Sequence, residues 1–245
     1  ITGSPMNLSA VPRLLGVLLH RTQRRFIRRL LSSPTQRRHA LEWVRSTAPG
    51  YLMDAPSPWI VFDAIDYIKS RLGKETRVFE YGSGGSTLFW LSNECSCVSV
   101  EHDPEWHGLV RGRIAETSPL DYRLVPPEPV VTAEELGDPA DPHSYRSDDI
   151  NFTGCSFRKY VSRIDSFPDG SFDVVLIDGR ARPSCIMHSA GKVRIGGLLV
   201  LDNADRDYYT RNTHPYLDGY TATRFHGAVP SLTWFSVTDI YTRVR

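Results

Sequence analysis

The hydrophobic positions of this chain predict amphipathic helices that alternate with short buried strands. Apolar residues recur at helical spacing between positions 58 and 72, and residues 40–46 also read as a helix. Short apolar runs at 78–79, 98–101 and 122–125 predict strands. Near the end, residues 231–244 alternate apolar with polar side chains, which favours a last, antiparallel strand at the edge of a sheet.

The N-terminal part has a different pattern. Residues 1–5 have the composition of an expression-vector remnant before a native start at Met6, and residues 6–50 form a basic extension. From Val11 to Leu31 apolar residues recur near helical spacing while arginines occupy the other faces. Such a helix could lie on an anionic membrane surface, recruit an acidic partner, direct the chain to an organelle, or pack with its arginine face in solvent.

The remainder, residues 51–245, predicts one domain with an insertion at about 126–160. This stretch combines several prolines with many acidic residues. It is long for a connection, and long loops of this kind are often lids or binding loops. We therefore expect it to cover a substrate, with a helix at 157–164 where it ends.

Composition and charge restrict the possible functions. The 29 basic and 28 acidic residues nearly balance, which argues against a general binder of polyanions. The balance is uneven along the chain, because residues 1–50 hold nine arginines against Glu42 alone. No apolar stretch approaches the ~20 residues that span a bilayer. The four cysteines form no zinc pattern, so we expect reduced thiols and a cytoplasmic protein, peripheral to a membrane at most.

The most informative motif follows the first strand. The run from Glu80 to Thr87 reads Glu-Tyr-Gly-Ser-Gly-Gly-Ser-Thr and leads into the apolar residues 88–91, which would open a helix. Glycines let a backbone turn tightly and approach a ligand, and the free amides of a helix N-terminus would face that ligand. Glu101 lies at the tip of the next strand, where a carboxylate can accept both hydroxyls of a ribose. Together these features indicate a nucleoside-cofactor site.

The loop also indicates which cofactor. The dinucleotide fingerprint requires a third glycine, and Thr87 stands at that position, so NAD is disfavoured. Glu80-x-Gly82-x-Gly84 followed by hydroxyl residues resembles motif I of the class I S-adenosylmethionine-dependent methyltransferases. The resemblance extends over residues 77–209, with 172–179 as the fourth strand and 196–203 as the fifth. It implies a Rossmann-like α/β fold whose mostly parallel, seven-stranded sheet has an antiparallel last strand and helices on both faces.

The resemblance also implies roles for single residues. Gly82 and Gly84 would approach S-adenosylmethionine through their backbone, and Ser86 would meet its methionine carboxylate. Glu101 would bind the ribose, and His102 would pack on the adenine. Glu80 and Asp178 complete the cofactor-binding set that the family pattern implies.

Within the family, segments 80–82, 100–104, 177–178 and 201–203 look most like catechol O-methyltransferases and their natural-product and sugar-modifying relatives. In that branch the corresponding residues hold a divalent metal, which implies Asp178, Asp202 and Asn203 as ligands. Two carboxylates and an amide carbonyl are hard oxygen donors, suited to Mg²⁺. The plainer interpretation is that Asp202 and Asn203 only cap a turn after a strand.

One departure bears on the acceptor. Catechol O-methyltransferases place a basic lysine three residues after the first metal-binding aspartate, and here that position is Ala181, so a catechol is not expected. Without a metal, Asp178 would serve as the base, with His214 or His188 assisting. Arg180, together with Arg182 and Arg206, would offer forked donors to carboxylate, phosphate or sugar oxygens of the acceptor.

The sequence thus predicts an O-methyltransferase for a small-molecule or sugar hydroxyl, assisted by a divalent metal. A metal-independent methyltransferase is the first alternative. A nucleic-acid methyltransferase is disfavoured, because the fourth strand ends in Ile177-Asp178-Gly179 and lacks the tetrad that grips a flipped base. A third alternative is a catalytically silent scaffold recruited by the basic helix.

Overall fold

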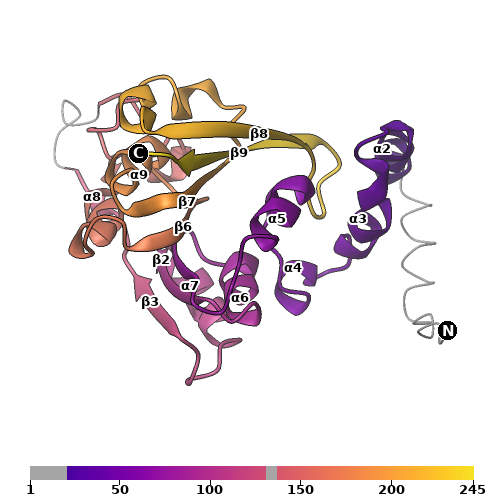
Figure 1. Cartoon of the computed structure of the whole chain (residues 1–245), viewed down its shortest axis with the longest axis horizontal. Helices are drawn as coiled ribbons and strands as arrows, with labels where there is room; N and C mark the ends of the chain where they lie inside the picture. Colours follow the sequence, from indigo (N-terminus) through magenta and orange to yellow (C-terminus); the bar gives the residue numbers. More distant parts are fainter. Residues whose placement is uncertain (1–20, 131–136) are drawn as a thin grey trace.

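A computed structural model describes residues 21–130 and 137–245, and its centre is a seven-stranded sheet with the order β3-β2-β1-β6-β7-β9-β8 (Figure 1). The strands are β1 Arg77–Tyr81, β2 Ser96–Glu101, β3 Leu120–Leu124, β6 Phe172–Ile177, β7 Val193–Asp202, β8 Tyr220–Ala228 and β9 Phe235–Arg243. β1, β2, β3, β6 and β7 are parallel, and β9 runs antiparallel to β7. The predicted sheet architecture is therefore confirmed.

The central strands are buried on both faces, which explains their continuous apolar runs. Along β6, Val174 and Leu176 pack into one hydrophobic core, while Val175 and Ile177 pack into a second core on the opposite face. The first core is covered by α5 Phe62–Lys69 and α6 Gly85–Ser92. The second is covered by α8 Arg158–Val161, η5 Ser162–Ser166 and α9 Arg182–Ser189.

The expected position of the last strand was wrong. β9 is antiparallel as predicted, but it lies between β7 and β8, and β8 forms the edge of the sheet. The side chains of β8 are mostly exposed, whereas those of β9 are mostly buried. Alternation along a strand shows that one of its faces is buried and carries no information about which strands lie beside it.

Helix ends deviate in ways that local geometry explains. α3 spans Ala40–Ser46 as predicted, but α5 begins at Phe62, because Val61 is extended with φ −58° and ψ 131°. The helix predicted at 157–164 is divided into α8 and η5. Further helices were not predicted, among them α4 Tyr51–Asp54, α7 Pro104–Arg111, η6 Asp207–Tyr209 and η7 His214–Leu217.

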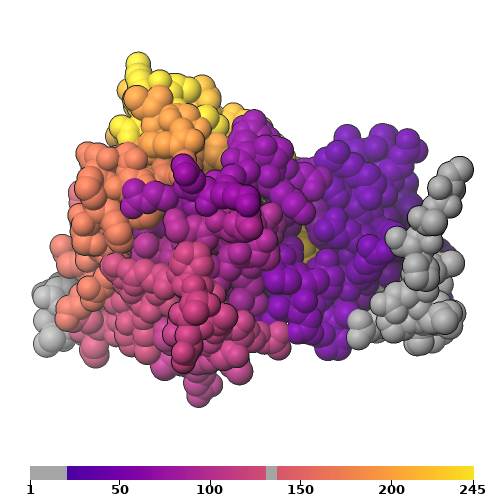
Figure 2. All heavy atoms as spheres, turned by 60° about the horizontal axis from the view of Figure 1, so that its bottom comes forward, coloured from indigo at the N-terminus to yellow at the C-terminus, as the bar shows by residue number. Residues whose placement is uncertain are grey.

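The N-terminal extension packs into the first core. It contains α2 Arg21–Ser32, η2 Arg37–His39 and α3, and Figure 2 shows it as the indigo region on one side of the molecule. Phe26, Leu30 and Trp43 are buried in the first core, and Trp43 Nε1 donates to the carbonyl of Leu232 at 2.6 Å. The expected vector remnant and residues 6–20 of the extension, which include the first part of the predicted basic helix, lie outside the described residues. No helix in the described ranges is long and apolar enough to cross a membrane.

The insertion at 126–160 is held by a two-residue strand pair, β4 Glu128–Pro129 with β5 Cys155–Ser156. A short helix, η4 Ile150–Phe152, follows Asp149, whose side chain accepts from the backbone N–H of Asn151 at 3.0 Å. Asn151 and Phe152 reach the cleft described below. Residues 131–136 of the insertion lie outside the described residues.

Candidate active site

A cleft of about 910 Å³ lies at the carboxyl ends of β1, β2, β6 and β7. Its floor contains the glycine loop, Glu101 and the acidic ends of β6 and β7. Its upper walls come from the segments 52–59 and 232–234 and from η4. Of the residues predicted from the sequence, the cleft brings together Gly82, Gly84, Ser86, Glu101, His102, Asp178, Arg180, Asp202 and Asn203.

The glycine loop is held close to its neighbours. Gly82 has φ +91°, and a Cβ on it would lie 3.0 Å from the Cα of Gly179, so this turn requires glycine. A Cβ on Gly85 would lie 2.4 Å from two carbonyl oxygens of the 52–57 segment. At Gly84, by contrast, a Cβ would meet only the Trp106 ring, at 3.6 Å. The loop therefore presents bare backbone to the cleft.

Glu80 does not line the cleft, which corrects its place in the expected cofactor-binding set. It is fully buried behind the loop, where it accepts from the hydroxyl of Thr87, from Ser99 Oγ at 2.7 Å and from Trp90 Nε1 at 2.9 Å. Burial raises the pKa of Glu80 to about 7, although these hydrogen bonds oppose the rise. Thr87 Oγ1 also accepts from the N–H of Gly84 at 3.0 Å. The residue in place of a third glycine thus connects Glu80 to the loop.

Glu101 is also buried, and its carboxylate organises the loop. One oxygen accepts from the N–H and the hydroxyl of Ser83 at 2.9 and 3.0 Å. The other accepts from the N–H groups of His102 and Asp103 at 2.7 and 2.9 Å. Burial alone would raise the pKa of Glu101, but the interactions with His102, Asp103 and Ser83 hold it at about 2. A ribose hydroxyl could bind here by replacing the hydroxyl of Ser83.

His102 lies beside Glu101 at the wall of the cleft. Its Nδ1 is 2.7 Å from Glu101 Oε1, and its ring meets Phe152 and Phe157 edge to face. Trp106, at the start of α7, donates from Nε1 to the carbonyl of Ser83 at 2.8 Å and remains 40% exposed. The rings of His102 and Trp106 therefore line the cleft on either side of Glu101 in the sequence.

Asp178, Asp202 and Asn203 meet where β6 and β7 end. Asp202 Oδ1 accepts from Thr238 Oγ1 at 2.8 Å, and Asn203 has a left-handed φ of 51°. Burial and the neighbouring charge of Asp178 raise the pKa of Asp202 to about 7, against the effect of Arg182. Burial also raises the pKa of Asp178, while Arg182 opposes the rise. Asp202 is therefore a buried carboxylate beside Asp178, whose side chain is 24% exposed.

Arg182 is a close neighbour of Asp178 and Asp202, and the sequence did not predict this contact. Its side chain is buried, and Nη2 donates to Asp178 Oδ1 at 3.0 Å. It also donates to three main-chain carbonyls: those of Gly179 at 3.0 Å, Asp178 at 3.1 Å and Asp202 at 2.5 Å. One oxygen of Asp178 is thus already bound to a fixed cation. The three predicted ligands have suitable donor chemistry for Mg²⁺, and Arg182 already binds one oxygen of the first of them.

The other charged candidates differ in position. Arg180 lines the cleft and pairs with Asp149 of the insertion at 2.8 Å, and Arg206 lines it with an exposed side chain. His214 lies instead in a separate hollow beside Arg224 and Asp239. His188 binds Asp165 at 2.9 Å and is not among the residues that line the cleft. The structure therefore does not bring either histidine to the predicted base.

Sequence reasoning missed the upper walls of the cleft. They contain Leu52, Met53, Trp59, Leu232 and Trp234. Trp59 is 49% exposed and Trp234 is 57% exposed, although large aromatic residues are usually buried to a greater extent. Trp59 Nε1 donates to the carbonyl of Pro230 at 2.8 Å, which joins the two wall segments. The tryptophans were visible in the sequence, but nothing local indicated that these two would be exposed.

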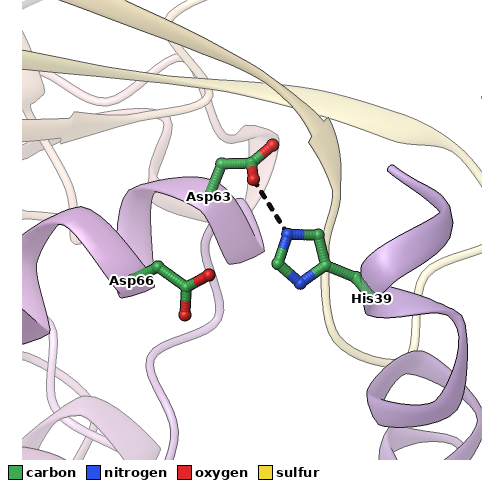
Figure 3. A group of neighbouring side chains, drawn as sticks. All are labelled: His39, Asp63 and Asp66. Atoms are coloured by element: carbon green, nitrogen blue, oxygen red, sulfur yellow. Dashed lines mark hydrogen bonds and ion pairs between the residues drawn. The ribbon is translucent and has the colours of Figure 1, made fainter. Parts of the chain in front are cut away.

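A second acidic cluster lies outside the cleft, at the junction of the extension and α5 (Figure 3). Among the described His, Cys, Asp and Glu residues, His39, Asp63 and Asp66 form the one group close enough to hold a metal ion. Asp63 already binds His39 Nε2 at 2.8 Å, Gln36 Nε2 at 2.5 Å and the guanidinium of Arg38. Gln36 also accepts from the N–H of Ala228 at 2.9 Å. The cluster is therefore a polar contact that holds the extension against the sheet.

No family model matches the chain, and no curated protein matches it. Solved structures do. A candidate O-methyltransferase from Klebsiella pneumoniae is 13% identical, with 98% of this chain and 92% of that chain covered and a TM-score of 0.50. The O-methyltransferase TomG of Streptomyces achromogenes, solved with S-adenosylmethionine, is 15% identical over 73% of this chain and 78% of that one, with a TM-score of 0.49.

A third similar structure is an O-methyltransferase from Bacillus cereus in complex with S-adenosylhomocysteine. It is 13% identical, covers 98% of this chain and 92% of that chain, and has a TM-score of 0.46. At these identities the likeness establishes the fold, and the Klebsiella structure carries that conclusion. The chain has the class I methyltransferase fold that the glycine loop predicted.

Proposed function

We propose that this protein transfers the methyl group of S-adenosylmethionine to a hydroxyl group of a small molecule. The observation that carries the proposal is the content of one cleft. Its cofactor end contains the bare-backbone glycine loop and Glu101, and its acceptor end contains the acidic ends of β6 and β7, which begin directly beside Gly82. In α/β sheets of this kind, ligands bind at the carboxyl ends of the strands.

The cofactor end has the features that S-adenosylmethionine requires. The glycine loop offers bare backbone to the ligand, and the N-terminus of α6 offers amides and Ser86 to its carboxylate. Glu101 would accept from the ribose hydroxyls, and His102 and Trp106 would border the adenine. When bound, the cofactor supplies a methyl group already activated on a sulfonium. The protein's task is then mainly alignment, which can contribute ~7–11 kcal/mol to lowering a barrier.

The acceptor end is amphipathic. Its walls expose the apolar faces of Trp59 and Trp234 beside Leu52, Met53 and Leu232. Its floor offers Asp178 and Asp202 for the proton of a hydroxyl, and Arg206 offers a guanidinium at the mouth. This combination suits an acceptor with a flat apolar or sugar ring that stacks on indole, with its hydroxyl directed toward the acidic floor.

Calorimetry with S-adenosylmethionine and S-adenosylhomocysteine tests the cofactor assignment. We expect saturable binding of both, and Glu101→Gln should weaken it by roughly 100-fold because charged hydrogen bonds to the ribose are lost. Glu105→Gln, which alters an exposed glutamate on α7, is the matched control and should bind as the wild type does. Thermal melts of both variants show whether the loop still folds. Binding of NAD in place of these compounds would refute the proposal.

Turnover tests the acceptor assignment. Wild-type protein incubated with hydroxyl-bearing ring compounds should release S-adenosylhomocysteine with at least one of them. Trp59→Ala and Trp234→Ala should raise KM for that acceptor more than they lower kcat, because the indoles contact the ring and not the reacting atoms. Tight cofactor binding without turnover across a broad panel would instead favour the silent scaffold.

A further inference from the structure

The acidic floor of the cleft contains a positive charge of its own. The resemblance places a divalent cation on Asp178, Asp202 and Asn203, and Arg182 donates directly to the first of these. The sequence supplies this arginine at the start of α9, after Ala181, whose left-handed φ of 48° turns the chain between β6 and the helix. The turn brings the side chain back beneath the ends of β6 and β7.

The contacts of Arg182 fix it in that position. Four hydrogen bonds leave from its three nitrogens, and their acceptors belong to the residues that follow β6 and to the last residue of β7. Its guanidinium also lies 5.0 Å from the centre of the Tyr209 ring. The side chain of Arg182 is only 8% exposed, whereas that of Asp178 is 24% exposed. A guanidinium so completely used is a structural cation rather than a mobile one.

The charges around the floor leave little need for a second cation. The floor carboxylates are Asp178 and Asp202, and three guanidinium groups line the same end of the cleft, from Arg180, Arg182 and Arg206. Arg180 is partly neutralised by Asp149 at 2.8 Å. A divalent ion on Asp178 would have to bind the second carboxylate oxygen, beside the guanidinium, or displace the guanidinium from the first oxygen. Displacement would leave three carbonyls and a buried charge without their partner, which is costly.

We infer that Arg182 is a built-in cation bound to the first of the three predicted metal ligands, so the floor of the cleft holds its acceptor without a metal ion. Arg182 acts here as a positioning residue: it fixes Asp178 and joins the ends of β6 and β7. The statement that the acceptor binds without a metal ion rests on the proposed function. The statement that Arg182 takes the role of a cation on Asp178 does not rest on it and is tested separately.

The test is a thermal melt with Mn²⁺ or Mg²⁺ added to the metal-stripped protein. The wild-type melting temperature should not change up to millimolar concentrations. Arg182→Gln leaves Asp178 and Asp202 without their cation, so we expect a lower melting temperature that Mn²⁺ raises by at least about 2 °C. Arg182→Lys keeps a positive charge and should show no such response. A role for Arg182 in packing alone would not produce this gain of metal response.

Arg224→Gln is the matched control. Arg224 pairs with the buried Asp239 through two hydrogen bonds of 2.8 Å and donates to the carbonyl of Ala204 at 3.2 Å, but it is not among the residues that line the cleft. Its loss should lower the melting temperature without a response to Mn²⁺. A wild-type protein stabilised by Mn²⁺ through Asp202, as shown by loss of the effect in Asp202→Asn, would overturn the inference. A folded Arg182→Gln that ignores Mn²⁺ would overturn it too. If Arg182→Gln does not fold, the wild type and Arg182→Lys are titrated with Mn²⁺ instead. A rise in the melting temperature of either protein would overturn the inference, and unchanged melting temperatures would support it.

The same samples separate this inference from the proposed function. Wild-type turnover should survive treatment with EDTA, and restoration of a lost activity by Mg²⁺ would contradict a metal-free floor. Failure to bind S-adenosylhomocysteine would remove the proposed function, whereas the response to Mn²⁺ would still report on Arg182.

Discussion

At the scale of single residues, the cofactor end of the cleft depends on two buried carboxylates with opposite properties. Glu101 accepts four hydrogen bonds and is held ionised, with a pKa of about 2. Glu80 lies deeper, and burial raises its pKa to about 7. Both were identified from the sequence as ligand-binding residues. Only the structure separates the one that faces the cleft from the one that supports the loop from behind.

Glu80 should make stability depend on pH. Its pKa rises from 4.5 when exposed to about 7 when folded, so its contribution is complete below pH 4.5 and is lost as pH rises through 7. This difference corresponds to about 3 kcal/mol. Glu80→Gln carries no titrating proton and should lack this loss, as urea unfolding at pH 5 and pH 8 can measure. Glu75→Gln, at an exposed site, should follow the wild type. Identical pH profiles for Glu80→Gln and wild type would rule out the raised pKa.

Gly179 tests the close packing at the end of β6. A Cβ at this position would lie 2.0 Å from Tyr160 Oη, so Gly179→Ala should destabilise the protein by about 2–3 kcal/mol through overpacking. Tyr160→Phe removes the obstructing oxygen, and in that background Gly179→Ala should cost at least about 1 kcal/mol less. Gly108→Ala on α7 meets open space and should be neutral or stabilising. Additive costs for Gly179 and Tyr160 in chemical unfolding would disprove the clash.

At the scale of elements, the sequence predicted what depends on local pattern. The runs at 98–101 and 172–177 became β2 and β6, and the glycine loop opened α6 as expected. It did not predict β8 at the edge, the exposed Trp59 and Trp234, or the use of Arg182 against Asp178. Each of these depends on contacts with segments that no local pattern specifies. A spacing rule identifies the residues at a strand end but not which neighbour neutralises them.

The docking of the N-terminal extension is another such contact. Trp43 on α3 is fully buried, and its indole donates to the carbonyl of Leu232, the residue that begins the upper wall of the cleft. Trp43→Ala should therefore destabilise the protein by about 3–5 kcal/mol. Leu41, two residues earlier on the same helix, is 54% exposed, and Leu41→Ala should cost under about 0.5 kcal/mol. Equal unfolding midpoints for the two variants would show that the extension does not share the core.

At the scale of the whole molecule, the cleft is an assembly of segments from distant parts of the chain. Its floor belongs to the sheet, one upper wall belongs to the segment after the extension, and another belongs to the β8–β9 connection. Ser231 joins the β8–β9 connection to the extension, since its N–H donates to Ser46 Oγ at 2.7 Å. The floor is thus fixed by the sheet, whereas the acceptor side depends on how the extension packs against it.

This assembly predicts which segments should become more ordered when a ligand binds in the cleft. The carbonyls of Leu52 and Ser57 lie against Gly85, so ordering the glycine loop should also order residues 52–59. Hydrogen exchange with S-adenosylhomocysteine should therefore slow at 82–86, at 101–103 and also at 52–59. The edge strand β8, whose central residues are exposed and lie outside the cleft, serves as the internal control and should exchange at an unchanged rate. Slowing confined to 82–86 and 101–103 would show that the wall responds independently of the cofactor floor.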